Sequence, residues 1–152
     1  MESPIEVFSN WALNGKDEGM EKNHSASVEN MIKYSTKGVN NYKFIDAGCG
    51  NGWVVRKVSS DKKCINAIGV DGSLHMIEKA KMLDDKNEYF CSDLLRWIPK
   101  EKADIVHSME VFYYFEKPEI LISHIHDNWL DNGGRLIMGI DHYLENKPSH
   151  SW

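Results

Sequence analysis

The sequence predicts an α/β fold of three layers, in which helices cover both faces of a mainly parallel sheet. Short apolar runs that end in an acid alternate with amphipathic stretches of helical period, and no repeat or low-complexity linker interrupts them. The first of these runs leads directly into a glycine cluster, as expected where a strand turns into a helix. At 152 residues the chain is expected to be a single domain, 1–152.

Residues 1–36 are expected to form a helical cap or lid. Apolar residues in Pro4–Leu13 predict a first helix, and Ser25 or Ser27 is a candidate N-cap for a second. The segment between them, Asn14–His24, has two glycines and mixed charges, which favours an irregular stretch within the lid.

Residues 43–140 are expected to form the core. Helices are predicted from near Trp53, over 74–83, and from Pro118 to a stop at Asn132–Gly133. Strands are predicted at Phe44–Asp46, Ile65–Asp71, Tyr89–Asp93, Ala103–Glu110 and Arg135–Ile140, the last after a glycine turn.

Composition excludes several classes of protein. The net charge is −5 and no block of Lys or Arg marks a surface that follows phosphates, so nucleic acid is a disfavoured partner. Three cysteines without C-x-x-C spacing favour reduced thiols in a cytoplasmic compartment and predict no metal site. No leader-like start and no membrane-spanning apolar stretch is present, so no membrane association is expected.

The stretch Phe44–Gly52 is the strongest functional signal. Its glycines, at positions 48, 50 and 52, permit positive φ and the close approach of a ligand to the backbone, and a helix beginning near Trp53 would point its N–H groups at that ligand. This pattern predicts a loop that holds a nucleotide-like cofactor. The dinucleotide fingerprint needs its third glycine where Trp53 stands, which weakens the alternative of a nicotinamide-dependent oxidoreductase.

The pattern D-x-G-x-G-x-G resembles that of class I S-adenosylmethionine-dependent methyltransferases, and the resemblance extends from about Lys43 to Ile140. It rests also on the acids Asp71 and Asp93 after the second and third strands and on the glycine turn before the fifth. The resemblance implies a Rossmann-like fold, S-adenosylmethionine as cofactor with S-adenosylhomocysteine as product, and methyl transfer to a small molecule. The alternative is a non-catalytic or partner-dependent subunit that only binds the cofactor.

The resemblance also implies the cofactor contacts. Asp71 is positioned to accept both ribose hydroxyls and Asp93 to accept from the adenine amino group. Asp46 would either fix the loop or contact the ammonium of the cofactor, and Cys49 is interpreted as a small side chain in a crowded loop. The full predicted set is Asp46, Gly48, Cys49, Gly50, Gly52, Asp71, Gly72, Ser73, Met76, Ser92, Asp93, Leu94, Ser108 and Met109.

Catalytic residues are less constrained, because the methyl group of the cofactor is already activated and the enzyme must chiefly align the acceptor. A base is useful only for an acceptor that arrives protonated, such as a hydroxyl or an ammonium, and a carboxylate acceptor needs none. Glu110, His24 and Tyr113 are the candidates for catalytic roles, while Trp11 and Met20 are candidates to close over the cofactor.

The chain departs from the family pattern after the fifth strand. Only twelve residues follow Ile140, so the antiparallel pair that usually completes the sheet has no room, and the fold is expected to be truncated there. The fifth strand is then an open border, which we expect to be covered by a second copy in a homodimer or by the tail Asp141–Trp152.

Overall fold

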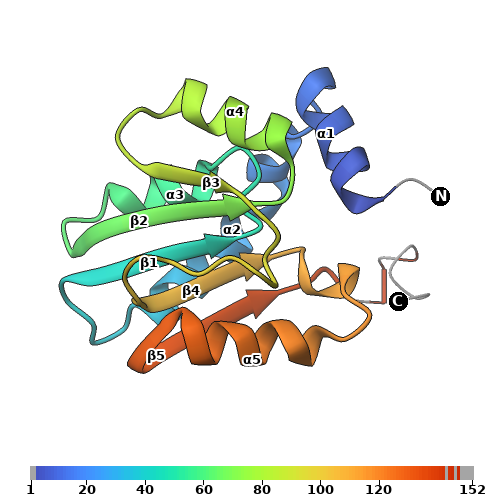
Figure 1. The fold of residues 1–152 in the computed structure, drawn as a ribbon. Helices are drawn as coiled ribbons and strands as arrows, with labels where there is room; N and C mark the ends of the chain where they lie inside the picture. The colour runs from blue at the N-terminus through green and yellow to red at the C-terminus, as the bar shows by residue number, and fades with distance from the viewer. Residues whose placement is uncertain (1–2, 143, 146, 148–152) are drawn as a thin grey trace.

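The structure, a computed structural model, describes residues 3–142, 144, 145 and 147, which include five α-helices and five strands (Figure 1). The elements in chain order are α1 (Pro4–Asn14), α2 (Glu18–Ser35), β1 (Tyr42–Ala47), α3 (Trp53–Ser59), β2 (Cys64–Asp71), α4 (Leu74–Leu83), β3 (Glu88–Cys91), β4 (Ala103–Met109), a 3₁₀ turn (Phe112–Tyr114), α5 (Pro118–Asn128) and β5 (Leu130–Gly139). None of the described helices is both long and apolar enough to cross a membrane.

The strands form one sheet in the order β3-β2-β1-β4-β5, and every pair is parallel. The predicted α/β fold is therefore confirmed. Chain order reverses between β1 and β4, which is the place where open parallel sheets bind ligands at the carboxyl ends of the strands. In Figure 1 the arrowheads of the strands point toward the side of the molecule that carries α1.

Two apolar clusters lie on the two faces of the sheet. Residues of α2, α3 and α4 pack on one face around Tyr42 and Phe44 of β1, and α5 packs on the other against Ile45 and Ala47. Neighbouring residues of one strand thus serve opposite cores, as the pleat requires. The segment 92–102 closes the α5 face. It is held there because Trp129 Nε1 donates to the carbonyl oxygen of Trp97 at 2.8 Å.

The fifth strand begins earlier than predicted. Helix α5 ends at Asn128, and Leu130 already pairs with Ala103. The next ladder pair joins Ile105 to Arg135, so the predicted glycine turn is a bulge inside β5. Within the described residues β5 pairs only with β4 and forms one border of the sheet. The tail residues 143, 146 and 148–152 lie outside the described residues.

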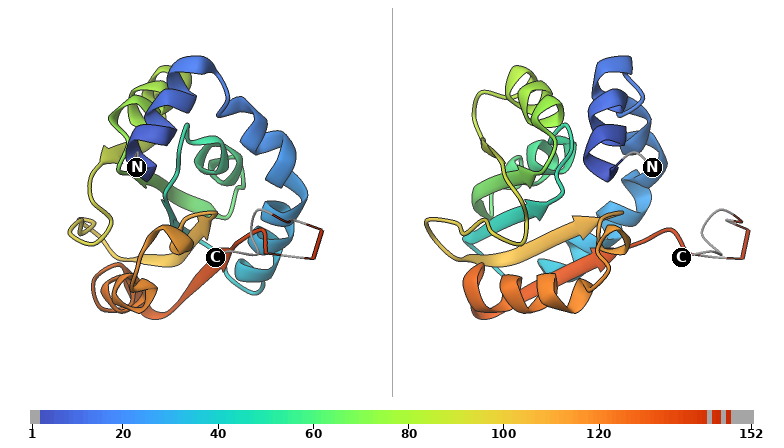
Figure 2. Two further views of the ribbon diagram at one scale, coloured as in Figure 1. Left: turned by 90° about the vertical axis from the view of Figure 1, so that its right-hand side faces the viewer. Right: turned by 45° about the vertical axis from the view of Figure 1, so that its right-hand side comes forward.

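The prediction of an irregular stretch at Asn14–His24 is wrong. Helix α2 begins at Glu18, and only a three-residue turn separates it from α1 (Figure 2). Gly15, with φ of 70°, ends α1, and acids in the first turn of α2 interact favourably with the positive end of the helix dipole. The predicted caps Ser25 and Ser27 therefore lie within a helix.

Candidate functional site

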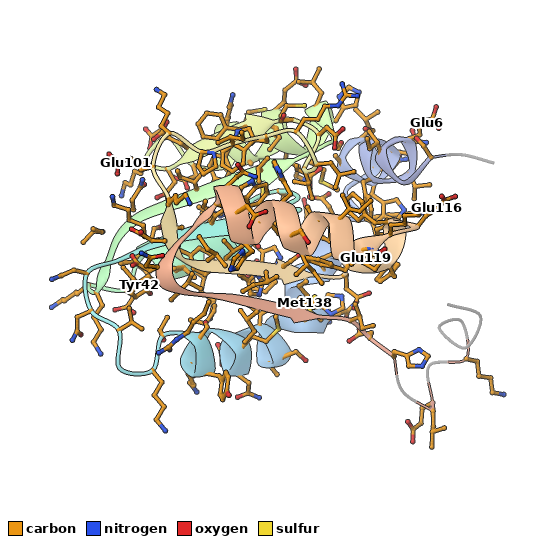
Figure 3. All side chains as sticks on the ribbon, turned by 60° about the horizontal axis from the view of Figure 1, so that its bottom comes forward. Glu6, Tyr42, Glu101, Glu116, Glu119 and Met138 are labelled. Carbon is orange, nitrogen blue, oxygen red and sulfur yellow. The ribbon has the colours of Figure 1, made fainter. Side chains whose placement is uncertain are left out.

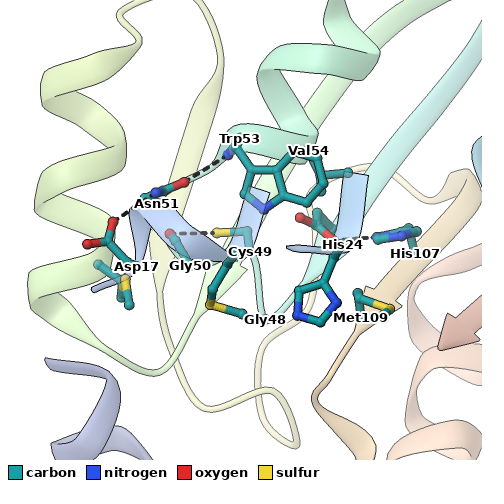
Figure 4. Close-up of a pocket in the computed structure, with 13 residues that line it drawn as sticks. Asp17, His24, Gly48, Cys49, Gly50, Asn51, Trp53, Val54, His107 and Met109 are labelled. Atoms are coloured by element: carbon teal, nitrogen blue, oxygen red, sulfur yellow. Dashed lines mark hydrogen bonds and ion pairs between the residues drawn. The ribbon is translucent and has the colours of Figure 1, made fainter. Parts of the chain in front are cut away.

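Two adjoining cavities lie beyond the carboxyl ends of the strands. The main cavity has a volume of about 340 Å³, and the inner cavity a volume of about 40 Å³. The main cavity is lined by Ile5, Phe8, Met20, Gly48, Gly50, Asp71, Gly72, Met76, Ser92, Asp93, Leu94, Met109, Glu110, Val111, Tyr114 and Phe115. The inner cavity (Figure 4) is lined by Asp17, Met20, His24, Asp46, Gly48, Cys49, Gly50, Asn51, Trp53, Val54, Met76, His107 and Met109.

The glycine loop that follows β1 lines both cavities through Gly48 and Gly50. Gly48, Gly50 and Gly52 all have positive φ, as the sequence predicted, but they are glycines for different reasons. A Cβ at position 48 would lie 2.3 Å from Val111, and a Cβ at position 52 would lie 2.5 Å from the ring of Tyr89. A Cβ at Gly50 would meet only the sulfur of Met76, at 3.9 Å. The outer glycines are therefore needed for packing, whereas Gly50 presents open backbone to the cavity.

Asp71 ends β2 and ties this loop to α4. Its carboxylate accepts the N–H of Gly50 at 2.9 Å and the N–H of Ser73 at 2.8 Å. Sequence reasoning gave this acid only a ligand role, and the structure adds that it fixes the loop. Burial raises the pKa of Asp71, and the two N–H donors oppose that rise. Each carboxylate oxygen keeps a free lone pair that can accept a further donor.

Three residues of the predicted cofactor set are buried or hydrogen-bonded within the protein itself. Burial, followed by the charges of Asp71 and Asp46, raises the pKa of the Cys49 thiol well above its usual range, so this thiol is inert. The Ser73 hydroxyl caps α4 by accepting the N–H of Met76 at 3.3 Å. The Ser108 hydroxyl donates to the carbonyl oxygen of Ala47 at 2.8 Å, which joins β4 to β1.

Asp46 and His107 form a buried pair at the centre of the sheet. The Nδ1 atom of His107 lies 2.7 Å from an Asp46 oxygen, and both side chains line the inner cavity (Figure 4). The histidine also stacks on Phe44, and its Nε2 atom has no hydrogen-bond partner among the described residues. Its complete burial and its bond to Asp46 are typical of a hydrogen-bonded core histidine.

Glu110 follows β4 in a left-handed conformation, with φ of 59°. This conformation is uncommon for a residue with a side chain and is found often at functional sites. The carboxylate is only 8% exposed, accepts the Tyr113 hydroxyl at 2.9 Å and accepts the backbone N–H of Asp141. The Tyr113 hydroxyl lies 3.2 Å from that of Tyr114, and it is Tyr114 that lines the main cavity.

A buried latch centred on Asp17 joins the start of α2 to the glycine loop and to α4, and sequence reasoning missed it. Asp17, 1% exposed at the start of α2, accepts from Asn51 Nδ2 at 2.8 Å and from Lys79 Nζ at 2.8 Å. Asn51 belongs to the glycine loop and Lys79 to α4. A second contact places the Ser9 hydroxyl of α1 2.9 Å from that of Ser73. No short motif marks such pairs, because their members are far apart in sequence.

Most of the predicted site residues lie around the cavities. Met20, predicted to close over the site, lines both, and His24 lines the inner one, with its Nδ1 atom 3.4 Å from an Asp141 oxygen. Five predicted residues line neither cavity: Trp11, Gly52, Ser73, Ser108 and Tyr113. The described residues contain no group of three or more His, Cys, Asp or Glu side chains that could hold a metal ion.

Comparison with known families identifies the family of the chain. A family model described as a methyltransferase domain matches residues 45–138, which include the glycine loop, Asp71 and Glu110. The chain belongs to the methyltransferase domain family. Together with the parallel sheet, this match confirms the class I, Rossmann-like fold that the sequence resemblance implied.

Curated relatives of this methyltransferase domain include two trans-aconitate 2-methyltransferases. The one from Agrobacterium fabrum is 30% identical over 106 residues, and the one from Klebsiella pneumoniae is 25% identical over 107. These alignments cover 69% and 70% of this chain but only 40% and 42% of the relatives. The chain thus spans about two-fifths of the length of the curated relatives it matches.

Solved structures show the same fold. In a complex between a Haloferax volcanii methyltransferase activator and a putative methyltransferase, the matched chain has a TM-score of 0.83 and 28% identity, and the match covers all of this chain and 66% of that one. A complex of DhpI with S-adenosylhomocysteine (SAH) matches with a TM-score of 0.71 at 17% identity, over 88% of this chain and 65% of that one.

The different reasons for the glycines can be tested by thermal unfolding. Gly50→Ala introduces only the cost of positive φ, about 1–2 kcal/mol. Gly52→Ala adds a clash with Tyr89, which brings the expected loss to about 2–5 kcal/mol. Circular dichroism melts should therefore show a lower melting temperature for Gly52→Ala. Equal melting temperatures for the two variants would contradict the packing role of Gly52.

The Asp17 latch predicts how the N-terminal helices α1 and α2 are held in place. Asp17→Ala leaves Asn51 and Lys79 without their shared acceptor and is expected to cost on the order of 3 kcal/mol locally. Hydrogen exchange should accelerate in α1 and the first turns of α2, while the amides of β1 and β4 stay protected. Glu18→Ala is the matched control, because Glu18 also contacts Lys79, at 3.3 Å, but is 74% exposed. Similar hydrogen-exchange rates in α1 and α2 of the two variants would show that Asp17 does not hold these helices in place.

Proposed function

We propose that this methyltransferase domain binds S-adenosylmethionine and transfers its methyl group to a small-molecule acceptor. The observation that carries the proposal is that the open backbone of Gly50 and the Asp71 carboxylate face one cavity of about 340 Å³, a volume typical of cofactor sites. The loop belongs to the part of the chain that the family model matches. Two solved neighbours, DhpI and the N-methyltransferase NodS, are complexes with SAH, which supports the same cofactor here.

The residues around the main cavity fit this cofactor. In the proposed arrangement Asp71 accepts from the ribose hydroxyls, and Asp93 accepts from the adenine amino group beside Ser92 and Leu94. The methionine end lies along the glycine loop, near Asp46. When bound, the cofactor supplies an activated methyl group, so the main task of the protein is to align the acceptor and exclude water.

For the acceptor side we retain the predicted residues Glu110, His24 and Tyr113. Glu110 lines the main cavity, and Tyr113 donates to it. In this proposal Glu110 contacts the acceptor and Tyr113 orients the Glu110 carboxylate. His24, in the wall of the inner cavity, is a second candidate base for a protonated acceptor.

A partner-dependent subunit is the rival proposal, and one observation favours it. The neighbour from Haloferax volcanii is in a complex with a methyltransferase activator. Both proposals require cofactor binding, but only an enzyme active alone forms a methylated product without a second protein. Mass spectrometry of reactions with the purified chain separates the two.

We also propose that residues 1–36 act as a lid over a core formed by 43–140, and that the protein is cytoplasmic. The lid is supported by Ile5, Phe8 and Met20 in the wall of the main cavity. A reducing compartment is supported by the free thiols of Cys49, Cys64 and Cys91.

The cofactor proposal can be tested by calorimetry with SAH. Asp71→Asn removes the charge that would bind the ribose, and loss of charge-assisted hydrogen bonds worth roughly 1.5–3 kcal/mol predicts affinity about 10- to 150-fold weaker. Asp127→Asn is the matched control, since the Asp127 side chain is 68% exposed on α5. NAD should neither bind nor raise the melting temperature. Unchanged affinity of a folded Asp71→Asn protein would reject the ribose assignment.

We further propose that the open border of β5 is covered by a second copy of this chain. An unpaired strand edge favours strand pairing, and Met138 on this strand is 47% exposed (Figure 3). Light scattering at micromolar concentration should give twice the chain mass of 17.5 kDa. Met138→Lys should shift the protein toward monomer, because a charge on an edge opposes pairing. The control is Met82→Lys on α4, where Met82 is 84% exposed. A monomeric wild-type protein would contradict this proposal.

A further inference from the structure

The wall of the main cavity beyond β4 combines a buried carboxylate with aromatic rings. Glu110 contributes the carboxylate, and Phe8, Tyr114 and Phe115 contribute rings to the same cavity. The ring of Phe8 meets that of Tyr114 edge-on, with centroids 5.4 Å apart, so the lid helix α1 and the segment after β4 form one continuous aromatic surface. Trp11 extends this surface, with its ring 5.3 Å from Phe8.

The charged side chains that line the main cavity have one sign: they are the carboxylates Asp71, Asp93 and Glu110. The inner cavity adds Asp17, which is paired with Lys79, and Asp46, which is paired with His107. Neither set of described lining residues contains a lysine or an arginine. An anionic acceptor in the main cavity would therefore lose its hydration without gaining a lysine or arginine partner, which is costly. A cationic acceptor would gain a carboxylate and aromatic faces that attract it.

The hydrogen bonds of Glu110 keep its carboxylate in place for such a ligand. Its two oxygens each accept one donor, from Tyr113 and from the backbone of Asp141, which leaves acceptor capacity on both. Burial and the neighbouring Tyr114 hydroxyl raise the pKa of Tyr113, so Tyr113 remains protonated and continues to donate. The left-handed backbone at Glu110 directs this preorganised carboxylate into the cavity wall.

From this combination we infer that the methyl acceptor is an amine, bound as an ammonium between the Glu110 carboxylate and the rings of Phe8 and Tyr114. The inference rests on the proposed methyl transfer and adds the class of acceptor. The ammonium first gives a proton to Glu110. The nitrogen lone pair then forms the new N–C bond, while the C–S bond breaks and its electron pair stays on sulfur, giving the N-methylated ammonium and SAH. A carboxylate acceptor, such as the one named for the curated relatives, would meet no lysine or arginine in the described lining of the main cavity.

The first experiment separates this inference from the function on which it rests. Calorimetry with SAH alone tests cofactor binding, and absence of binding would overturn the proposed function itself. The chain saturated with SAH is then titrated with phenethylamine and, separately, with 3-phenylpropionate, which has the same ring and a similar length but the opposite charge. We expect phenethylamine to bind at least tenfold more tightly. A protein that binds SAH and shows no preference for the amine would overturn the inference.

The second experiment tests Glu110. The Glu110→Gln variant keeps the shape of the side chain and an acceptor for the N–H of Asp141, but it removes the charge. Its affinity for phenethylamine should fall about 10- to 150-fold, as expected for loss of a charge-assisted hydrogen bond, while its affinity for SAH is unchanged. Glu116→Gln is the matched control, because Glu116 is exposed outside the cavity wall (Figure 3).

Two results would contradict the role of Glu110. One is unchanged amine affinity in Glu110→Gln, and the other is an equal loss in Glu116→Gln. Mass spectrometry provides the chemical readout, in which the wild-type protein with S-adenosylmethionine should convert phenethylamine, and not 3-phenylpropionate, to a singly methylated product.

Discussion

The hydrogen bonds between Asp71 and the backbone on either side of it are the interaction on which the rest of the site depends. By accepting the N–H groups of Gly50 and Ser73, one carboxylate fixes the turn after β1 and the start of α4. These two turns form the wall of the main cavity next to the sheet. Burial raises the pKa of this carboxyl, while each of its oxygens keeps a lone pair for a further hydrogen-bond donor. In the proposed arrangement the atoms that fix the loop therefore also accept the donors of the ligand.

The parallel sheet determines where the other parts of the site lie. Because β1 and β4 are parallel neighbours, the glycine loop that follows β1 and Glu110 that follows β4 lie at the same edge of the sheet. Their chain connections leave in opposite directions, which is where such sheets bind ligands. The helices α1 and α2 then close this edge, and the buried side chain of Asp17 holds them to both the loop and α4. Each wall of the cavity thus comes from a different part of the chain.

Much of the core could be predicted from sequence because its signals are local. The apolar run ending in Asp46 and the glycines that follow it predict a strand, a turn and a helix from neighbouring residues alone. The N-terminal segment was predicted less well. Its two glycines and mixed charges predicted an irregular stretch, yet Gly15 ends one helix and Gly19 lies inside the next. The hydrogen bonds of Asp17 could not be predicted, because they depend on tertiary packing and not on any spacing in the sequence. For the same reason the sequence could not show that Tyr114, and not Tyr113, lines the cavity.

The three glycines of the loop have a consequence for how this domain can diverge. Two of them are required by neighbouring side chains, Val111 and Tyr89, whereas Gly50 has open space in front of it. Selection for folding alone would preserve positions 48 and 52 most strictly, because at position 50 it opposes only the cost of a positive φ. In a descendant that has become a pseudoenzyme, a side chain at position 50 between two retained glycines would therefore mark the loss of the ligand while the scaffold persists.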